Sequence, residues 1–118
     1  MKVEVRVYSG RHNPTWKLSQ KEDIELLAKI SSLNNTERDP IDMGLGYNGF
    51  IITRTADESS NLPEKIEINN GIILVNYGNN RLPKYVDPGR SLEKWILRTG
   101  SQYLDPGLVE YIEKEINK

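Results

Sequence analysis

The sequence contains no cysteine and only one histidine, His12. Without cysteine there is no disulfide framework, no thiolate nucleophile and no zinc–thiolate site, and this usage leans toward a reducing compartment. A single histidine cannot give a metal two imidazole ligands within one chain, and any serine–histidine–carboxylate arrangement would have to use His12. We therefore expect neither a metal site nor a cofactor.

The sequence also lacks an excess of either charge and lacks long apolar runs. Its 118 residues include 16 basic and 17 acidic side chains, for a formal net charge of -1. This balance gives no general attraction to a phosphate backbone, so nucleic acid is not expected as the main partner. The first residues, MKVEVRVYSG, alternate apolar and charged side chains and do not form the apolar core of a signal peptide. No stretch is long and apolar enough to span a membrane, so we expect a soluble, cytoplasmic protein.

A chain of this length predicts a single domain over residues 1–118, which buries roughly two thirds of its unfolded surface. Val3, Val5 and Val7 alternate with polar residues, which predicts a half-buried strand over 2–8. Ser19 and Glu22 then match a capping box and predict a helix that ends by about residue 33. The buried stripe of this helix is expected to consist of Ile24, Leu27, Ala28 and Ser31. Leu26 and Ile30 are expected to widen it.

The clearest local signal is KIEINNGIILVNY (65–77), where Asn70-Gly71 predicts a two-residue hairpin turn between two strands. In that register Ile68 opposes Ile73 and Ile66 opposes Val75, and all four share the face that we assign to the core. Ile72 and Leu74 then face the other side. The segment FIITR (50–54) predicts a further strand before the hairpin.

Two later helices are predicted from DPG segments, with Asp87 and Asp105 as N-caps and proline at the first helical position. The first helix is expected to bury Leu92, Trp95 and Ile96, and the second Leu108, Ile112 and Ile116. The predicted fold is therefore α+β: a small, mainly antiparallel four-stranded sheet with about three helices packed on it. The predicted order is strand, helix, three strands, helix, helix.

Gly44, Gly46 and Gly49 in GLGYNG have the spacing of a dinucleotide-binding loop. That loop follows a strand and opens a helix, whereas these glycines follow a loop and lead into the strand FIITR. We interpret them as positions that need positive φ or a close backbone approach just before a strand.

The segment YSGRHNPTW (8–16) predicts a stiff loop, because Asn13-Pro14 restricts the backbone of both residues. Arg11 presents a planar donor fork to a carboxylate or phosphate, and Trp16 presents an apolar face with one donor. In the structural alternative, Trp16 covers the start of the first helix and Arg11 pairs within the chain with Asp87 or Glu93.

Acid–base chemistry would have to combine His12 with loop carboxylates. Ser9 lies three residues before His12 in the sequence, but no nucleophile-elbow pattern surrounds it. The loop carboxylates lack the alternating pattern of a calcium loop: Asp39, Asp42, Asp57 and Glu58.

Three segments together resemble a family of small uncharacterised proteins: SGRHNPTW (9–16), LGYNGF (45–50) and DPGRSLEKWIL (87–97). The family pattern reads SGRxNPxW, GYxGF and DPxRxLExWLL, and it covers about a fifth of the chain. The resemblance implies no activity, substrate or cofactor. It does group the three segments, which leads us to expect several side chains to converge at one end of the sheet, near a helix N-terminus that favours an anion: Arg11, Asn13, Tyr47, Asn48 and Arg90.

These features favour a small noncatalytic binding or interaction module. Its predicted partner is a protein, a peptide or a small anionic ligand. An alternative is a small hydrolase or transferase that uses His12 and the loop carboxylates in a cleft. A third interpretation is a homo-oligomer that pairs through Ile72 and Leu74. The predicted ligand-binding residues are Arg11, His12, Asn13, Trp16, Tyr47, Asn48 and Arg90.

Overall fold

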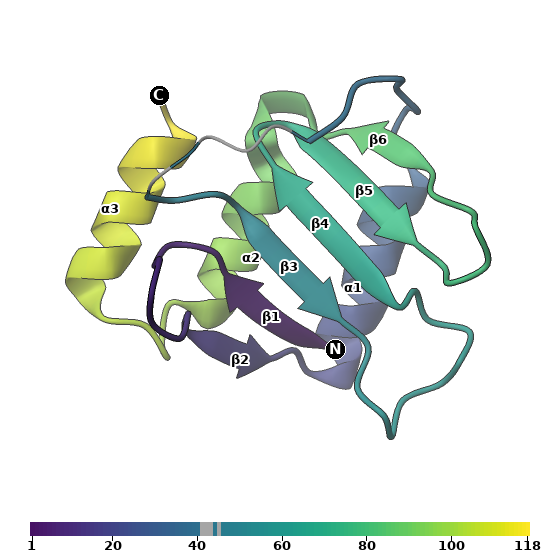
Figure 1. Cartoon of the computed structure of the whole chain (residues 1–118), viewed down its shortest axis with the longest axis horizontal. Helices are drawn as coiled ribbons and strands as arrows, with labels where there is room; N and C mark the ends of the chain where they lie inside the picture. Colours follow the sequence, from purple (N-terminus) through teal and green to yellow (C-terminus); the bar gives the residue numbers. More distant parts are fainter. Residues whose placement is uncertain (41–43, 45) are drawn as a thin grey trace.

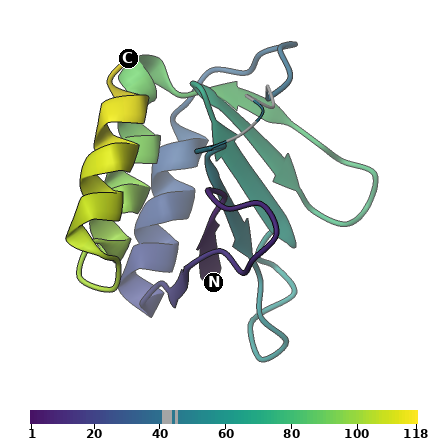
Figure 2. The same cartoon turned by 60° about the vertical axis from the view of Figure 1, so that its left-hand side comes forward.

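The computed structural model describes residues 1–40, 44 and 46–118. Within these residues the chain forms one antiparallel sheet in the order β2-β1-β3-β4-β5-β6 and three α-helices. All three helices lie on one side of the sheet (Figures 1 and 2). The strands are β1 (Lys2–Val5), β2 (Thr15–Lys17), β3 (Phe50–Thr53), β4 (Lys65–Asn69), β5 (Ile72–Asn76) and β6 (Lys84–Val86). The helices are α1 (Gln20–Ser31), α2 (Ser91–Gly100) and α3 (Pro106–Ile116), and a 3-10 turn, η1 (Pro88–Arg90), precedes α2.

The α+β class and the antiparallel sheet agree with the sequence, but the prediction of four strands is wrong. The two additional strands, β2 and β6, have three residues each and form the two edges of the sheet. Three residues are too few to display the alternation from which strands are predicted. The strand expected over 2–8 is also shorter, because β1 ends at Val5.

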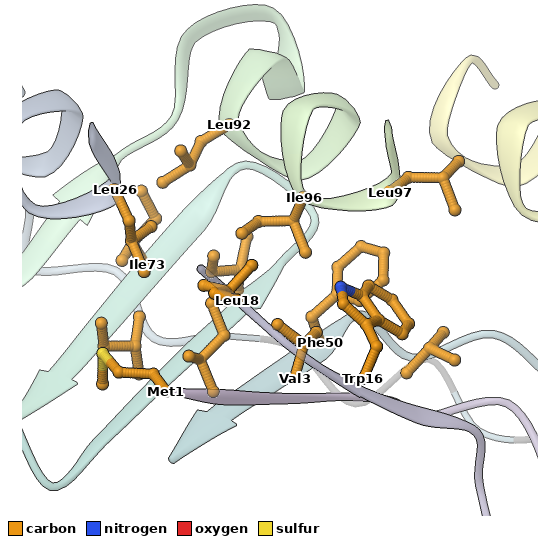
Figure 3. Packing of buried hydrophobic residues seen from close by; sticks show 14 of the residues in the cluster. Met1, Val3, Trp16, Leu18, Leu26, Phe50, Ile73, Leu92, Ile96 and Leu97 are labelled. Carbon is orange, nitrogen blue, oxygen red and sulfur yellow. The ribbon is translucent and has the colours of Figure 1, made fainter. Parts of the chain in front are cut away.

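The β4–β5 hairpin forms in the predicted register. Ile66 pairs with Val75, and Ile68 pairs with Ile73. These four side chains are at most 1% exposed and belong to the core between the sheet and the helices. Figure 3 shows this core, in which Val3, Phe50 and Trp16 from the sheet lie below residues of α1 and α2.

The opposite face of β5 carries Ile72 and Leu74, the two residues through which the sequence allows a homo-oligomer to pair. Ile72 is only 2% exposed and Leu74 is half-buried, although neither belongs to the helix-side core. The chain itself therefore covers Ile72, whereas Leu74 lines a surface pocket on this face.

Helix α1 begins with the predicted capping box. The Ser19 hydroxyl accepts from the Glu22 amide at 3.1 Å, and the Glu22 carboxylate accepts from the Ser19 amide at 2.8 Å. The predicted buried stripe is wrong at its centre, because Ile24 is 65% exposed and Ala28 and Ser31 are also exposed. The helix does bury Leu26 and Ile30, which were expected only to widen the stripe, and it also buries Asp23.

A buried ion pair explains why α1 turns Asp23, and not Ile24, toward the sheet. The Met1 ammonium donates to both carboxylate oxygens of Asp23, at 3.0 and 3.1 Å, and to Glu58 at 2.6 Å. Because the ammonium group is fully buried, Asp23 must face the sheet to neutralise it. Leu26 and Ile30 lie on the same side of α1 as Asp23 and are therefore buried in the core.

The two DPG segments open their helices differently. Asp105 caps α3 as predicted, accepting from the amides of Gly107 and Leu108 at 3.0 and 3.2 Å. Asp87 lies further from its helix, because Pro88–Arg90 forms a 3-10 turn and α2 starts at Ser91. The Asp87 carboxylate nevertheless reaches the amides of Leu92 and Glu93, at 2.8 and 3.0 Å.

In the described part of the chain, every helix is too short or too polar to cross a membrane.

Candidate functional site

A buried network around the Arg90–Glu93 ion pair links two of the segments that carry the family resemblance, because Tyr47 of the segment 45–50 reaches the pair in 87–97. Glu93 in α2 is completely buried, and its carboxylate accepts two hydrogen bonds from Arg90, at 3.0 and 2.7 Å. The Tyr47 hydroxyl donates to the same carboxylate. Such bidentate, charge-assisted contacts fix the orientation of the guanidinium group as well as neutralising the buried charge.

Arg90 reaches Glu93 from an unusual backbone conformation. Its φ is 55°, in the left-handed region that side-chain-bearing residues rarely adopt. The adjacent 3-10 turn and the Asp87 cap hold it there, and its guanidinium also donates to the Glu115 carbonyl of α3 at 3.4 Å. A left-handed arginine of this kind is a recognised marker of a functional or structurally constrained position.

An aromatic series connects Tyr47 to the remaining segment of the resemblance. The Tyr47 and Phe50 rings are 5.8 Å apart, and the Phe50 and Trp16 rings 6.1 Å apart, both edge to face. The Trp16 indole N–H donates to the Thr99 hydroxyl at 3.0 Å. The three segments therefore meet around α2, at the end of the sheet where β1 finishes and β3 begins (Figure 1).

The glycines before β3 allow this close packing. A side chain at Gly49 would place its Cβ 2.1 Å from the Ile68 carbonyl oxygen, and one at Gly46 would lie 2.6 Å from the Tyr111 hydroxyl. Both glycines have positive φ, as predicted for GLGYNG. The Tyr111 hydroxyl also accepts from the Tyr47 amide at 3.2 Å, which ties this segment to α3.

Above the ion pair lies an open pocket of about 390 Å³. Its walls come from the segment before β3, the β4–β5 turn, the 3-10 turn η1 and the C-terminal part of the chain from α3 onward. The lining is polar and aromatic, with amide, phenol, guanidinium, carboxylate and ammonium groups: Tyr47, Asn69, Asn70, Arg90, Tyr111, Glu115 and Lys118.

Burial and pairing shift several pKa values around this pocket. Burial, together with the Glu93 charge, raises the pKa of Tyr47 far above its ordinary value, so the phenol stays protonated and donates. Hydrogen bonding to Glu93 raises the pKa of Arg90 further. Burial raises the pKa of Asp87, and this effect exceeds the opposing effect of the two amide donors from α2.

The predicted site residues separate into different surroundings. Tyr47 and Arg90 line the pocket, whereas Arg11 and His12 are exposed on the loop between β1 and β2. Arg11 does not pair with Asp87 or Glu93, as the structural alternative expected: its guanidinium lies 3.8 Å from the Tyr8 ring centroid. Glu93 is instead occupied by Arg90.

Asn13, Trp16 and Asn48 have contacts within the fold. The side-chain oxygen Oδ1 of Asn13 accepts from the backbone amides of Val7 and Tyr8, at 3.0 and 2.8 Å, and so shapes the loop. Trp16 is 5% exposed and lies against Gly100 at the end of α2, not over the start of the first helix. The backbone N–H of Asn48 donates to the Arg6 carbonyl at 2.7 Å. This hydrogen bond places the segment before β3 beside the end of β1.

The loop carboxylates are engaged away from His12. Asp39 pairs with Lys84 at 2.8 Å, Asp57 accepts from the Thr55 hydroxyl at 2.6 Å, and Glu58 binds the N-terminal ammonium. Asp42 lies outside the described residues. Within residues 1–40, 44 and 46–118, no hydrogen bond or ion pair connects His12 to a carboxylate, and no cluster of metal-ligating side chains is present.

Sequence reasoning missed Glu93, Tyr111, Asn69 and Asn70. Glu93 was considered only as a partner for Arg11, although its i,i+3 spacing from Arg90 was the available signal. Asn70 is predicted only as a turn residue, and Tyr111 belongs to a predicted helix without any further signal. None of these residues carries a local pattern that indicates a pocket.

Comparison of the chain with protein-family models, with curated proteins and with solved structures found no match. The candidate site is therefore defined by the geometry of this chain alone.

Proposed function

We propose that the protein is a small noncatalytic binding module, and that the pocket over the Arg90–Glu93 ion pair is its binding site. The observation that carries the proposal is the convergence of polar and aromatic groups from four separate parts of the fold on one pocket of about 390 Å³. Sites of this size with a few fixed polar groups are typical of ligand recognition.

The charges at the pocket favour a polar ligand without a strong negative charge. Arg90 is committed to Glu93, and Lys118 pairs with Glu115 at 2.9 Å. Neither cation is therefore available to neutralise an anion without losing its present partner. This argues for a ligand whose amide or hydroxyl groups exchange hydrogen bonds with the pocket, such as a peptide segment of a partner protein.

Two side chains are suited to bind such a group. Asn70 carries both an amide donor and an acceptor and makes no side-chain hydrogen bond to the described residues. Tyr111 is 39% exposed and presents part of its ring to the pocket. An aromatic ring beside an amide can hold a planar peptide group through stacking and hydrogen bonding.

The test uses N-acetyl amino-acid methylamides, which carry the peptide amide group, as probes in an NMR titration. Binding is expected to shift the backbone amide signals of Asn70 and Tyr111. Asn70→Gly should weaken this binding while the turn stays intact, because Asn70 has positive φ and glycine adopts it freely.

Asn80→Gly is the matched control. Asn80 also has positive φ, at 65°, but does not line the pocket. Equal binding by the two variants, or shifts confined to another surface, would contradict the assignment of the site.

A further inference from the structure

The two edges of the sheet differ in whether their backbone groups are paired. Outside β6, the segment 34–36 covers the edge: the Thr36 amide donates to the Lys84 carbonyl at 3.1 Å, and the Val86 amide donates to the Asn34 carbonyl at 2.9 Å. An isolated bridge between Asn35 and Tyr85 completes the cover. This edge has no free row of donors and acceptors for another strand.

The edge at β2 is open. The Leu18 amide donates to the Met1 carbonyl, and the Val5 amide donates to the Pro14 carbonyl. Because hydrogen-bonded and non-hydrogen-bonded pairs alternate along an antiparallel ladder, the backbone of Trp16 faces β1. The N–H and C=O groups of Thr15 and Lys17 point outward, and none of these four groups has a partner among the described residues.

These four groups are self-complementary. If a second β2 strand lies antiparallel to the first, with the twofold axis at Trp16, Thr15 of each copy is opposite Lys17 of the other. Each such pair exchanges two hydrogen bonds, so all four outward groups of each strand are satisfied. Only the backbone is required, and β2 already has the extended conformation.

The charges on the solvent face favour the same arrangement. Lys17 lies opposite Lys2 in the β1–β2 register, and Thr15 lies opposite Glu4. In the twofold arrangement the Lys2–Lys17 row of one copy continues into the Thr15–Glu4 row of the other. Lys17 of one copy then lies next to the neutral Thr15 of the other copy, and the acidic Glu4 follows on the next strand. No two like charges become direct neighbours across the new pair of strands.

We propose that the protein forms a weak homodimer through antiparallel pairing of β2 with β2 of a second copy, which joins the two six-stranded sheets into one continuous sheet. The dimer is weak because the pairing strand has only three residues, so the buried area is below that of a stable interface. Tyr103, 61% exposed beside Lys17 and Leu18 in a surface hollow, adds apolar contact next to the edge. This proposal is independent of the ligand pocket, which lies elsewhere.

Cysteine cross-linking tests the proposed register, because the chain has no native thiol. One preparation carries Thr15→Cys and a second, labelled with ¹⁵N, carries Lys17→Cys. A directly opposed hydrogen-bonded pair has Cα atoms about 5.5 Å apart, within the range of a disulfide. Two copies of the same variant place their thiols diagonally, roughly 7–8 Å apart by Cα, which disfavours the bond.

The mixture is therefore expected to form disulfide-linked dimers about ten times faster than either variant alone, with one labelled and one unlabelled chain in each dimer. Equal rates in the mixture and in the separate variants would overturn the register. Each variant retains the β1 ladder, so misfolding can be checked independently by its circular dichroism.

Sedimentation equilibrium from micromolar to millimolar concentration gives a second test on the unmodified chain. We expect a reversible dimer that Thr15→Pro abolishes, because proline removes one outward donor and no donor of the β1 ladder. Thr15→Val keeps that donor and should still dimerise. A chain that stays monomeric at millimolar concentration would refute the proposal.

Discussion

Removal of the Glu93 charge should destabilise the fold strongly, although the substitution is nearly isosteric. In Glu93→Gln, Arg90 loses its buried counter-charge and one of its two acceptors, while the Tyr47 hydroxyl keeps an oxygen acceptor. Removing one partner of a buried ion pair typically costs 3–5 kcal/mol. Because glutamine retains part of the hydrogen bonding, we expect the lower end, about 3 kcal/mol.

Urea denaturation followed by circular dichroism measures this change. For a slope of about 1.5 kcal/mol per molar urea, a loss of about 3 kcal/mol lowers the midpoint by about 2 M. The slope itself should stay constant, because the surface exposed on unfolding hardly changes.

A triple variant separates the cost of an unpaired charge from the net contribution of the network. Tyr47→Phe with Arg90→Met and Glu93→Leu replaces the three side chains of the network and leaves neither charge of the ion pair unpaired. Apolar replacement of a complete buried ion pair is often neutral, so the triple variant should be more stable than Glu93→Gln. An unchanged midpoint in Glu93→Gln, or a triple variant that is the least stable of the set, would refute this account.

Three further predictions concern the scaffold around the site. Gly49→Ala should lower the free energy of unfolding by about 3–5 kcal/mol in thermal melts, because its Cβ would lie 2.1 Å from the Ile68 carbonyl oxygen and the residue would also be strained by its positive φ. Gly10 has the same φ of 82° but nothing within 4 Å of such a Cβ, so Gly10→Ala should cost only about 1–2 kcal/mol. Burial raises the pKa of Glu58, but hydrogen bonds from the N-terminal ammonium and Thr55 outweigh it and lower the pKa from 4.5 to about 2. The stability that Glu58 contributes is therefore complete above about pH 4.5 and is lost as the pH falls toward 2. Glu58→Gln, made with a free N-terminal amine, should be up to about 3 kcal/mol less stable than the parent at pH 7. Near pH 2 the two proteins should be almost equally stable. Asn13→Ala leaves two loop amides without their acceptor and should cost about 1–3 kcal/mol, with faster hydrogen exchange of those amides as the direct readout; unchanged exchange would show that the side chain does not hold the loop.

Local signals in the sequence predicted the elements that depend on local geometry. Asn70-Gly71 determines the turn by its own backbone preference, so the β4–β5 register followed from the sequence. The capping box of α1 and the Asp105 cap of α3 are likewise contacts between residues two or three positions apart. In these cases the residues that decide the structure are neighbours in the chain.

The features that the sequence did not predict depend on distant contacts. The orientation of α1 follows from an ion pair between Asp23 and the chain's first residue, 22 positions away. Similarly, β2 exists because its three residues pair with β1, and three residues are too few to display the alternation that predicts a strand.

The candidate site shows the same limitation more strongly. Glutamate on a helix is ordinarily a surface residue, and nothing around Glu93 in the sequence indicates complete burial. Its burial depends on Arg90, held in a left-handed conformation, and on Tyr47, 46 positions away. The grouping of the three resembling segments did predict that Tyr47 and Arg90 would lie near each other, but not that an acidic residue would occupy the space between them.

The two tryptophans lie in unlike surroundings, which makes them separate optical reporters. Trp16 is enclosed by Phe50 and the end of α2, whereas Trp95 is half-buried with the Lys29 ammonium 5.4 Å from its ring centroid. Acrylamide should quench the Trp95 fluorescence first, and the blue-shifted remainder of the emission should come from Trp16. Fraying of β2 would then appear as a red shift of that protected component, at denaturant concentrations where the helices are still intact.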